Sequence, residues 1–329
     1  MANLPEGLKQ VKAGGSLTSD GKSIFALKGN NTTEFYRFSL DSSLWVPLTS
    51  VPLGTSGKKV KGGSDMGIIG DTLYLIKGNT NELLPFNLIN GNWGAGLPLV
   101  PGPYKCKDGS DVVAAVNEGR QGLFTLQGKS PGNFFWYDAG LKTWTAKQSI
   151  PTTDRMGKYK KPGDGAGLAF DGDNLIYAFK GNNTQGLWMY NIGINSWTEL
   201  DTIPAYGSTG KRKKVKAGGD LAFWQNGSNP QLYGIKGNKS REFWMYGIPL
   251  AGIPPSTNEA REEIQSGVLY HPPEQTVPTI LTRGQLDRLP QQGILYDGSG
   301  KQVNTNQVHD GVYFLRTNNS PTTKVIVTK

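Results

Sequence analysis

The chain has 329 residues, including 45 glycines, 20 prolines and 10% aromatic residues, which is typical of a protein built from many short strands and turns. A single cysteine excludes an internal disulfide, and the sequence has no run of 18 apolar residues that could span a membrane. The net charge of +9 lies in residues 1–255, because residues 256–329 contain seven basic and seven acidic residues. This one-sided excess favours an anionic partner or surface.

Five copies of one motif predict the fold. In each copy a turn leads into an apolar strand that ends in Lys-Gly-Asn or a close variant. The strand-end lysines, with glutamine in the third copy, are separated by 49, 50, 53 and 56 residues. A period near 50 residues made of short strands predicts a radial array of small sheets. The repeats lie near 8–54, 55–102, 103–154, 155–206 and 207–254.

The fourth copy shows how one repeat is expected to fold. Its predicted strands are 167–170, 175–179, 187–190 and 196–200, with an Asp-Gly hairpin turn after the first. Pro204 then ends the outer strand, because proline cannot donate to a β-ladder. Four short antiparallel strands correspond to one propeller blade.

Two series of aromatic residues recur at fixed places in the copies. The first series is Phe38, Phe86, Tyr137, Tyr190 and Tyr246, and the second is Trp45, Trp93, Trp144 and Trp197. Blades pack face to face, so we expect both series to form the core between blades rather than to stack on a ligand.

Residues 176–204, IYAFKGNNTQGLWMYNIGINSWTELDTIP, resemble the kelch repeat. That repeat has an apolar strand ending in Gly-Gly, followed by a Tyr, a Trp and a Pro. Here Lys180-Gly181 replaces the glycine pair, and the lysine recurs in four copies. The resemblance covers roughly residues 8–254 and implies an all-β fold, a β-propeller of about five four-stranded kelch-like blades.

A lysine-rich string precedes each predicted inner strand. In a propeller these strings join one blade to the next on a single face, so they predict a basic ring around the channel mouth. The ring would bind an acidic polysaccharide or protein, would be a solvated rim, or would help to pack the mouth; nucleic acid is the weakest candidate, because the strings lack interleaved exposed aromatics. The predicted ring residues are Lys12, Lys59, Lys61, Lys105, Lys107, Lys160, Lys214 and Lys216.

A second ring of lysines ends the second strands. We expect these side chains to be structural and to donate hydrogen bonds to carbonyl groups of neighbouring blades, although a binding role stays open. The residues are Lys28, Lys77, Lys180 and Lys236.

The sequence contains few residues suited to catalysis. Both histidines, His271 and His309, follow the repeats, so a histidine metal site within the propeller is excluded. Cys106 lies between two lysines without a nearby general base. A carboxylate lies near each inner strand of blades two to five, which fits turn and strand-end hydrogen bonding better than hydrolysis. These residues are Asp65, Asp111, Asp164 and Asp220. We therefore predict no catalytic residue, no metal and no cofactor.

The fifth copy departs from the pattern. No tryptophan follows Tyr246, and the next Ile-Pro pair arrives early, so its outer strand is predicted to be shortened or lost. Residues 2–5 look like the end of an outer strand and could close the ring by pairing with this blade. An unpaired edge there would be open to another chain.

The last part of the chain lacks the repeat. We expect a propeller over 1–255, a linker over 256–268 and a small β-sandwich over 269–329. The strings YDGSGKQV, GVYFLR and KVIVTK resemble the C-terminal sorting domain of bacterial proteins secreted by the type IX (Por) system. That resemblance implies a secreted or cell-surface protein, although the first residues show no signal peptide.

These features lead to three hypotheses of function. The first is a non-enzymatic surface protein for binding or adhesion, whose basic face holds an acidic glycan or protein. The second is a self-assembling filament subunit, a homopolymer joined by strand complementation between the fifth blade and a terminal segment. The third is a propeller enzyme, a lyase or oxidase. A fold alone does not choose between them.

Overall fold

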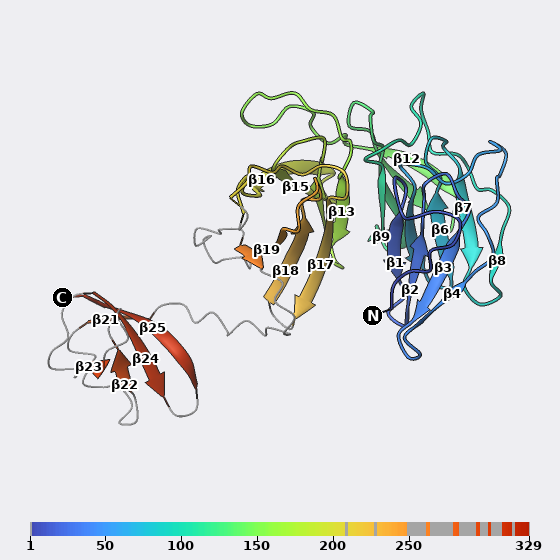
Figure 1. Ribbon diagram of the computed structural model, residues 1–329. Helices are drawn as coiled ribbons and strands as arrows, with labels where there is room; N and C mark the ends of the chain where they lie inside the picture. The colour runs from blue at the N-terminus through green and yellow to red at the C-terminus, as the bar shows by residue number, and fades with distance from the viewer. Residues whose placement is uncertain are drawn as a thin grey trace. The chain divides into compact units, whose positions relative to one another are not determined.

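The computed structural model describes residues 2–207, 210–226 and 229–248, and beyond them the backbone of six strands. The chain divides into two compact units, Met1–Ile264 and Gln265–Lys329. All described regular elements are β-strands, and the first unit is a β-propeller of five four-stranded antiparallel sheets (Figure 1).

Each blade takes its four strands consecutively from the chain. Blade one contains β1 (Ser16–Ser19), β2 (Ser23–Leu27), β3 (Phe35–Ser39) and β4 (Leu44–Pro47). Blade two contains β5 (Asp65–Ile69), β6 (Thr72–Ile76), β7 (Leu83–Asn87) and β8 (Asn92–Trp93). Blade three contains β9 (Asp111–Asn117), β10 (Arg120–Leu126), β11 (Phe134–Asp138) and β12 (Thr143–Lys147). Blade four contains β13 (Gly167–Phe170), β14 (Leu175–Phe179), β15 (Gly186–Asn191) and β16 (Ser196–Thr202). Blade five contains β17 (Asp220–Asn226), β18 (Asn229–Ile235), β19 (Phe243–Gly247) and β20 (Arg261–Glu263).

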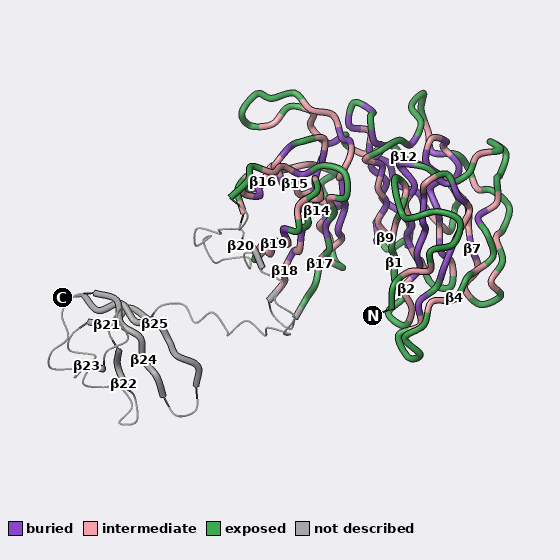
Figure 2. The backbone as a smooth tube through the Cα atoms, viewed as in Figure 1, coloured by how far each residue is buried: buried purple, intermediate pink, exposed green. Residues whose placement is uncertain are grey.

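The strands within a blade differ in burial because of their place in the ring. The second strands are largely buried, whereas β4 and β16 contain only exposed and half-buried residues (Figure 2). The first aromatic series is buried in blades one to four, as predicted. Each tryptophan of the second series pairs with it across the third and fourth strands, for example Trp197 opposite Tyr190.

The tryptophans also join successive blades, which confirms their predicted place between blades. Each indole N–H donates to a carbonyl of the segment that leaves the preceding blade: Trp93 to Thr49 (2.9 Å), Trp144 to Pro98 (2.9 Å) and Trp197 to Gln148 (2.8 Å). In blade one, Trp45 donates to Ala2 (2.9 Å). Residues 2–5 thus lie against blade one, and none of them belongs to a strand that pairs with blade five. The predicted closure by these residues is wrong.

Four hydrophobic cores hold the blades together, one between each successive pair from blade one to blade five. No such core among the described residues joins blade five to blade one. Side-chain exposure at one position of the first strands and one position of the second strands shows this difference between the boundaries. Leu17 of β1 is 67% exposed, whereas Met66, Val112, Leu168 and Leu221 are 3–8% exposed. Ile235 of β18 is 40% exposed, whereas its counterparts in blades one to four are 0–3% exposed.

The fifth blade has a fourth strand, which the sequence analysis placed in the linker 256–268. β20 pairs with β19 through three residues, from Arg261 opposite Met245 to Glu263 opposite Phe243. The strand is recruited from 14 residues after the end of β19 rather than from the next turn. A sequence reading missed it because this segment is polar and carries no Trp or Ile-Pro signal.

The C-terminal unit contributes one described sheet in the order β21-β25-β24-β22-β23. Its strands are β21 (Thr279–Thr282), β22 (Ile294–Tyr296), β23 (Gln302–Val303), β24 (Gly311–Thr317) and β25 (Ser320–Thr328). β21 runs parallel to β25 and the other neighbours are antiparallel. The expected strands are present, and the described strands form one sheet; the two-layered sandwich over 269–329 stays a prediction. The two histidines lie outside the described residues.

Candidate functional site: a basic face around an acidic channel

The lysine-rich loops that lead into the first strand of each blade are called the leading loops. The strand-end glycines bring these loops close to the ends of the second strands. Gly181 adopts a φ of +58°, and a Cβ there would lie 2.4 Å from backbone atoms of the loop that leads into β13. Gly29 and Gly237 have the same conformation and an equally close loop in blades one and five. Only glycine allows this approach, so the Lys-Gly motif positions the leading loops.

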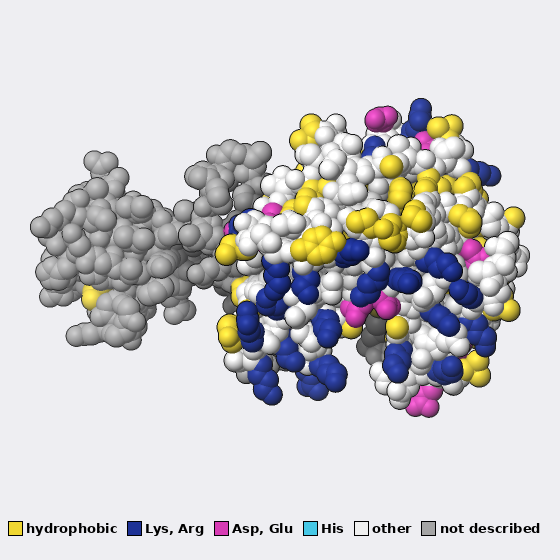
Figure 3. Space-filling model, turned by 90° about the horizontal axis from the view of Figure 1, so that it is seen from above, with side chains coloured by type: hydrophobic (Ala, Val, Ile, Leu, Met, Phe, Trp, Pro, Cys, Tyr) yellow, Lys and Arg dark blue, Asp and Glu magenta, His cyan; other side chains and the backbone are white. Residues whose placement is uncertain are grey.

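The leading loops all lie at the end of the propeller from which the first strands start, the upper end of β13 and β17 in Figure 1. Six predicted ring residues are exposed there: Lys12, Lys59, Lys61, Lys105, Lys107 and Lys216. Lys160 and Lys214 are half-buried. Figure 3 shows this face from above, with Lys and Arg side chains on both sides of a hollow and a few acidic side chains beside it.

Hydrogen bonds to strand-end asparagines fix which residues of the lysine-rich strings are equivalent. Asn30, Asn182 and Asn238 are equivalent, and their side-chain amides donate to the carbonyls of Gln10, Lys161 and Lys214. Lys161, not Lys160, is therefore the counterpart of Lys214. The adjacent lysines in this string made the register impossible to fix without these hydrogen bonds.

The loops that lead into blades four and five rise as two hairpins. Each is closed by an isolated bridge, Thr153 with Tyr159 and Tyr206 with Arg212. Burial, together with the neighbouring charges of Lys158, Arg212 and Lys160, lowers the pKa of Lys214. These cations therefore lie close together.

Two aromatic side chains are exposed on the same hairpins. Tyr159 is 57% exposed and Tyr206 is 60% exposed. The basic strings were expected to lack exposed aromatic residues, and this expectation is wrong for the fourth string, which contains Tyr159. A tyrosine ring beside ammonium groups can stack on a sugar or a base.

Inside the basic ring, the first residues of the inner strands line the channel. The five equivalent positions hold Ser16, Asp65, Asp111, Gly167 and Asp220. The three aspartates among them border a channel cavity of about 270 Å³. Asp65 is held in place, because it accepts hydrogen bonds from the Ser16 hydroxyl (2.5 Å) and the Val112 N–H (2.8 Å).

Asp164 is not part of this cluster, although the sequence analysis grouped it with the other three. It lies in the leading loop of blade four and pairs with Lys129 at 3.0 Å. The other three carboxylates influence one another's protonation. The enclosing channel wall raises the pKa of Asp111, and the charges of Asp65 and Asp220 raise it further. Burial and the charge of Asp65 raise the pKa of Asp220 to about 7.

The second lysine ring is buried between blades. Lys28, Lys77, Lys180 and Lys236 are at most 1% exposed. Lys77 donates to the carbonyl of Leu53 (2.5 Å) and Lys180 to that of Pro151 (2.7 Å), both in the segment that leaves the preceding blade. Lys28 donates to the carbonyl of Glu6 in the same way. These contacts match the expected hydrogen bonds to neighbouring carbonyls.

Most of these lysines also contact an acidic side chain. Lys28 pairs with Glu34 at 3.5 Å, Lys77 with Glu82 at 2.5 Å, and Lys236 with Glu242. In blade three both charges are replaced, and Asn133 donates to Gln127 at 2.9 Å. In blade four Lys180 lies 4.3 Å from the centre of the Trp188 ring.

Cys106 is fully buried in the core between blades two and three. Burial raises the pKa of its thiol to about 12, so it stays protonated at neutral pH. In the described part of the chain, no group of three His, Cys, Asp or Glu side chains is arranged to hold a metal ion. The same part contains no helix that is both long and apolar enough to cross a membrane.

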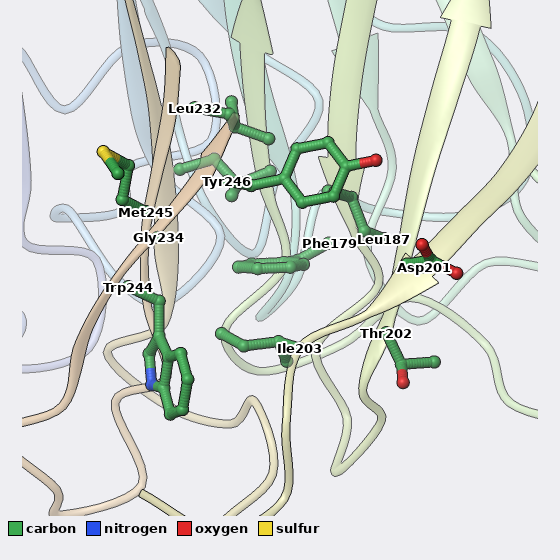
Figure 4. A pocket seen from close by; sticks show the side chains of 11 residues that line it. Phe179, Leu187, Asp201, Thr202, Ile203, Leu232, Gly234, Trp244, Met245 and Tyr246 are labelled. Carbon is green, nitrogen blue, oxygen red and sulfur yellow. The ribbon is translucent and has the colours of Figure 1, made fainter. Parts of the chain in front are cut away.

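A separate hollow lies between blades four and five. Phe179, Leu187 and Ile203 line it from blade four, and Trp244 and Tyr246 line it from blade five (Figure 4). It contains none of the residues that the sequence analysis proposed for binding.

Comparison with known proteins gives no family. No protein-family model and no curated protein matches this chain. Among solved structures, YjhT is similar with a TM-score of 0.48 and 14% identity over 70% of this chain and 74% of that chain. A protein of unknown function from Bacteroides thetaiotaomicron VPI-5482 is similar with a TM-score of 0.45 and 12% identity over 73% of this chain. This chain spans 56% of that second protein. The propeller fold accordingly rests on the strand pairing described above.

Proposed function

We propose that this protein is a non-enzymatic binding module at the bacterial cell surface, whose basic face holds an acidic polysaccharide. The observation that carries the proposal is the gathering of exposed lysines from five equivalent loops on one face (Figure 3). A ring of cations around a narrow mouth concentrates positive potential there. A polymer suits this site better than a small anion, because the charges are spread over several blades.

The hairpins of blades four and five favour a glycan over an acidic protein. They combine closely spaced cations with the exposed rings of Tyr159 and Tyr206. A ring face packs against the apolar side of a sugar, while ammonium groups bind its carboxylates or sulfates. The surface location is proposed from the C-terminal strings that resemble a type IX sorting domain.

Binding of polygalacturonate, a carboxylated glycan, tests this proposal at several salt concentrations. We expect saturable binding that weakens as salt screens the exposed lysines. Poly-L-glutamate and single-stranded DNA serve as competing probes. Tighter binding of either one would replace the glycan as the partner, and binding of none of the three would overturn the proposal.

A matched pair of variants distinguishes the contribution of the basic ring to binding from the effect of the protein's overall positive charge. Lys61→Gln with Lys216→Gln removes two ring charges, whereas Lys22→Gln with Lys142→Gln removes two exposed charges from hairpin turns at the other end of the blades. Two exposed ion contacts contribute up to about 1 kcal/mol each, so the first variant should bind roughly tenfold more weakly. Equal losses in both variants would show that the face is not a specific site.

Self-association is a second candidate, favoured by the uncovered faces of blades one and five. Leu17 and Ile235 are exposed where their counterparts are buried. Strand complementation at blade five has less support, since β20 already pairs with β19. Light scattering at low and high salt distinguishes the candidates: a salt-resistant polymer favours assembly, and a monomer near 35.7 kDa favours the binding module.

A further inference from the structure

An open groove of about 920 Å³ lies between blade one and blade five and continues into the channel mouth. The first strands of neighbouring blades pack against each other at the other four boundaries, β1 against β5, β5 against β9, β9 against β13 and β13 against β17. The described parts of β17 and β1 lack this packing, and the groove lies there instead. The two blades therefore leave room for another polypeptide segment.

The groove has apolar walls on both sides. Leu17 of β1 and Val11 of the first leading loop line it from blade one, and they are 67% and 54% exposed. Ile235 of β18 lines it from blade five and is 40% exposed. An apolar partner in the groove would remove these side chains from water, which favours binding.

The inner part of the groove is acidic, although the protein as a whole carries a net charge of +9. Among the described residues that line it, Lys12 is the one cation. Five aspartates line the groove: Asp65, Asp108, Asp111, Asp164 and Asp220. Asp164 pairs with Lys129, but within the described part of the chain none of the other four pairs with a lysine or an arginine. Carboxylates gathered in a cleft attract cations and repel anionic polymers.

Two strands that border the groove are edge strands. Leu17 of β1 and Asp220 of β17 both line it. In the described sheets, β1 pairs with β2 only and β17 pairs with β18 only. The free side of an edge strand offers N–H and carbonyl groups to an added strand, so an extended polypeptide suits this groove better than a small cation.

We propose that this groove is a docking site for a partner polypeptide, whose extended segment carries aliphatic side chains next to lysine or arginine. The aliphatic side chains pack between Leu17 and Ile235, and the cations pair with Asp111 and Asp220 at the channel. The groove takes cations, whereas the exposed lysine ring of the proposed function takes an anionic glycan. Neither proposal depends on the other.

Calorimetric titration with three blocked hexapeptides tests this proposal. The first peptide has three valines followed by three lysines; serines replace the valines in the second, and glutamines replace the lysines in the third. The titration is made at pH 8, where the carboxyl of Asp220 is ionised because its pKa is about 7. We expect the first peptide to bind in a one-to-one ratio and the other two to bind at least about tenfold more weakly. Absence of binding, or equal binding of the serine or the glutamine peptide, would overturn the proposal.

A matched pair of aspartate substitutions locates the cations of the peptide. Asp220→Asn keeps the size of the side chain and removes one charge of the groove, whereas Asp41→Asn removes an exposed charge from the turn between β3 and β4. Loss of one ion contact should weaken binding of the valine–lysine peptide about fivefold in Asp220→Asn, and binding should be unchanged in Asp41→Asn. Equal affinities of the two variants would contradict the assigned site.

A pair of leucine substitutions tests the apolar wall. Leu17 and Leu44 are 67% and 62% exposed, and Leu44 lies in β4 outside the groove. Both variants should fold, because neither side chain is buried in a core. Leu17→Ala should bind the peptide about fivefold more weakly through the loss of apolar contact area, and Leu44→Ala should bind it like the wild type. Unchanged binding in Leu17→Ala would also overturn the proposal.

Light scattering during the titration distinguishes a partner segment from a second copy of this chain. We expect a mass near 35.7 kDa before and after the peptide is added. A dimer that dissociates when the peptide is added would assign the groove to a second copy and overturn the choice of partner. Lys61→Gln with Lys216→Gln should bind the peptide at least as tightly as the wild type, so a failure of glycan binding and a failure of peptide docking are told apart.

Discussion

At the residue scale, one buried polar position between blades is satisfied in three ways. Blades one, two and five use a lysine and a glutamate, blade three uses Gln127 and Asn133, and blade four uses Lys180 with a carbonyl and the Trp188 ring. A buried charge without its partner is costly, whereas a neutral pair makes similar hydrogen bonds without the cost of desolvating ions. Blade three therefore shows that both charges can be replaced together, and blade four shows that a carbonyl and a ring can take the place of the acid.

Exchanging the charged pair of blade five for the neutral pair of blade three tests this view. Lys236 and Glu242 have the same sequence separation as Gln127 and Asn133. Lys236→Gln alone should lower the free energy of unfolding by about 3–5 kcal/mol, because Glu242 is left buried and uncompensated. The double variant Lys236→Gln with Glu242→Asn should recover most of this loss in urea denaturation. Additive losses would show that Lys236 and Glu242 are not coupled.

The pH dependence of the free energy of unfolding should show the stabilising contribution of Glu82. Burial alone would raise the pKa of this carboxyl, but hydrogen bonds from Lys77, Ser56 and Thr55 lower it to about 2. A carboxyl with a lowered folded-state pKa stabilises the protein above its unfolded pKa near 4.5, and this contribution is lost as the pH falls towards 2. Roughly 2–3 kcal/mol is at stake by this linkage. Denaturation of wild type and Glu82→Gln between pH 2 and 6 should show a steeper acid loss for the wild type, and parallel profiles would contradict it.

At the scale of elements, the glycine after each buried lysine couples the second strand to the leading loop. Its positive φ and the nearby backbone leave no room for a side chain in blade four. The same short segment thus buries a lysine and fixes the loop that carries exposed lysines. This coupling explains why the two lysine rings recur together in the sequence.

Two glycine substitutions in blade four separate backbone strain from steric conflict. Gly172 has a φ of +89° with no atom within 4 Å of a Cβ, whereas Gly181 has a φ of +58° with backbone atoms at 2.4 Å. Gly172→Ala should cost only the strain of the left-handed conformation, about 1 kcal/mol. Gly181→Ala should cost at least about 2 kcal/mol more, because the leading loop must move. Similar losses in thermal denaturation would show that the loop is not held by this contact.

At the scale of the whole molecule, four blade boundaries have hydrophobic cores, and among the described residues the boundary between blades five and one has none. Stability therefore comes from a chain of nearest-neighbour contacts rather than from a closed ring, as in other repeat proteins. The two end blades should contribute least, because each packs on one neighbour only.

Substitutions of equivalent leucines in the first strands test how stability is distributed over the blades. Leu168→Ala, at a position 6% exposed, should lower the free energy of unfolding by about 2–4 kcal/mol through the cavity that it creates. Leu17→Ala, at a position 67% exposed, should change it by less than about 0.5 kcal/mol. A large loss in Leu17→Ala would show that another part of the protein, or a second copy, covers blade one in solution.

The repeat by itself determined the number of blades, the strands of the first four blades, both aromatic series and most of the exposed lysines. These features follow from local periodicity, because a propeller builds each blade from consecutive residues. Tertiary structure decided what depends on register between distant segments: the channel cluster of Asp65, Asp111 and Asp220, the place of Lys161 and the recruitment of β20. These features depend on which residues of separate blades the packing places side by side, and local periodicity does not determine that.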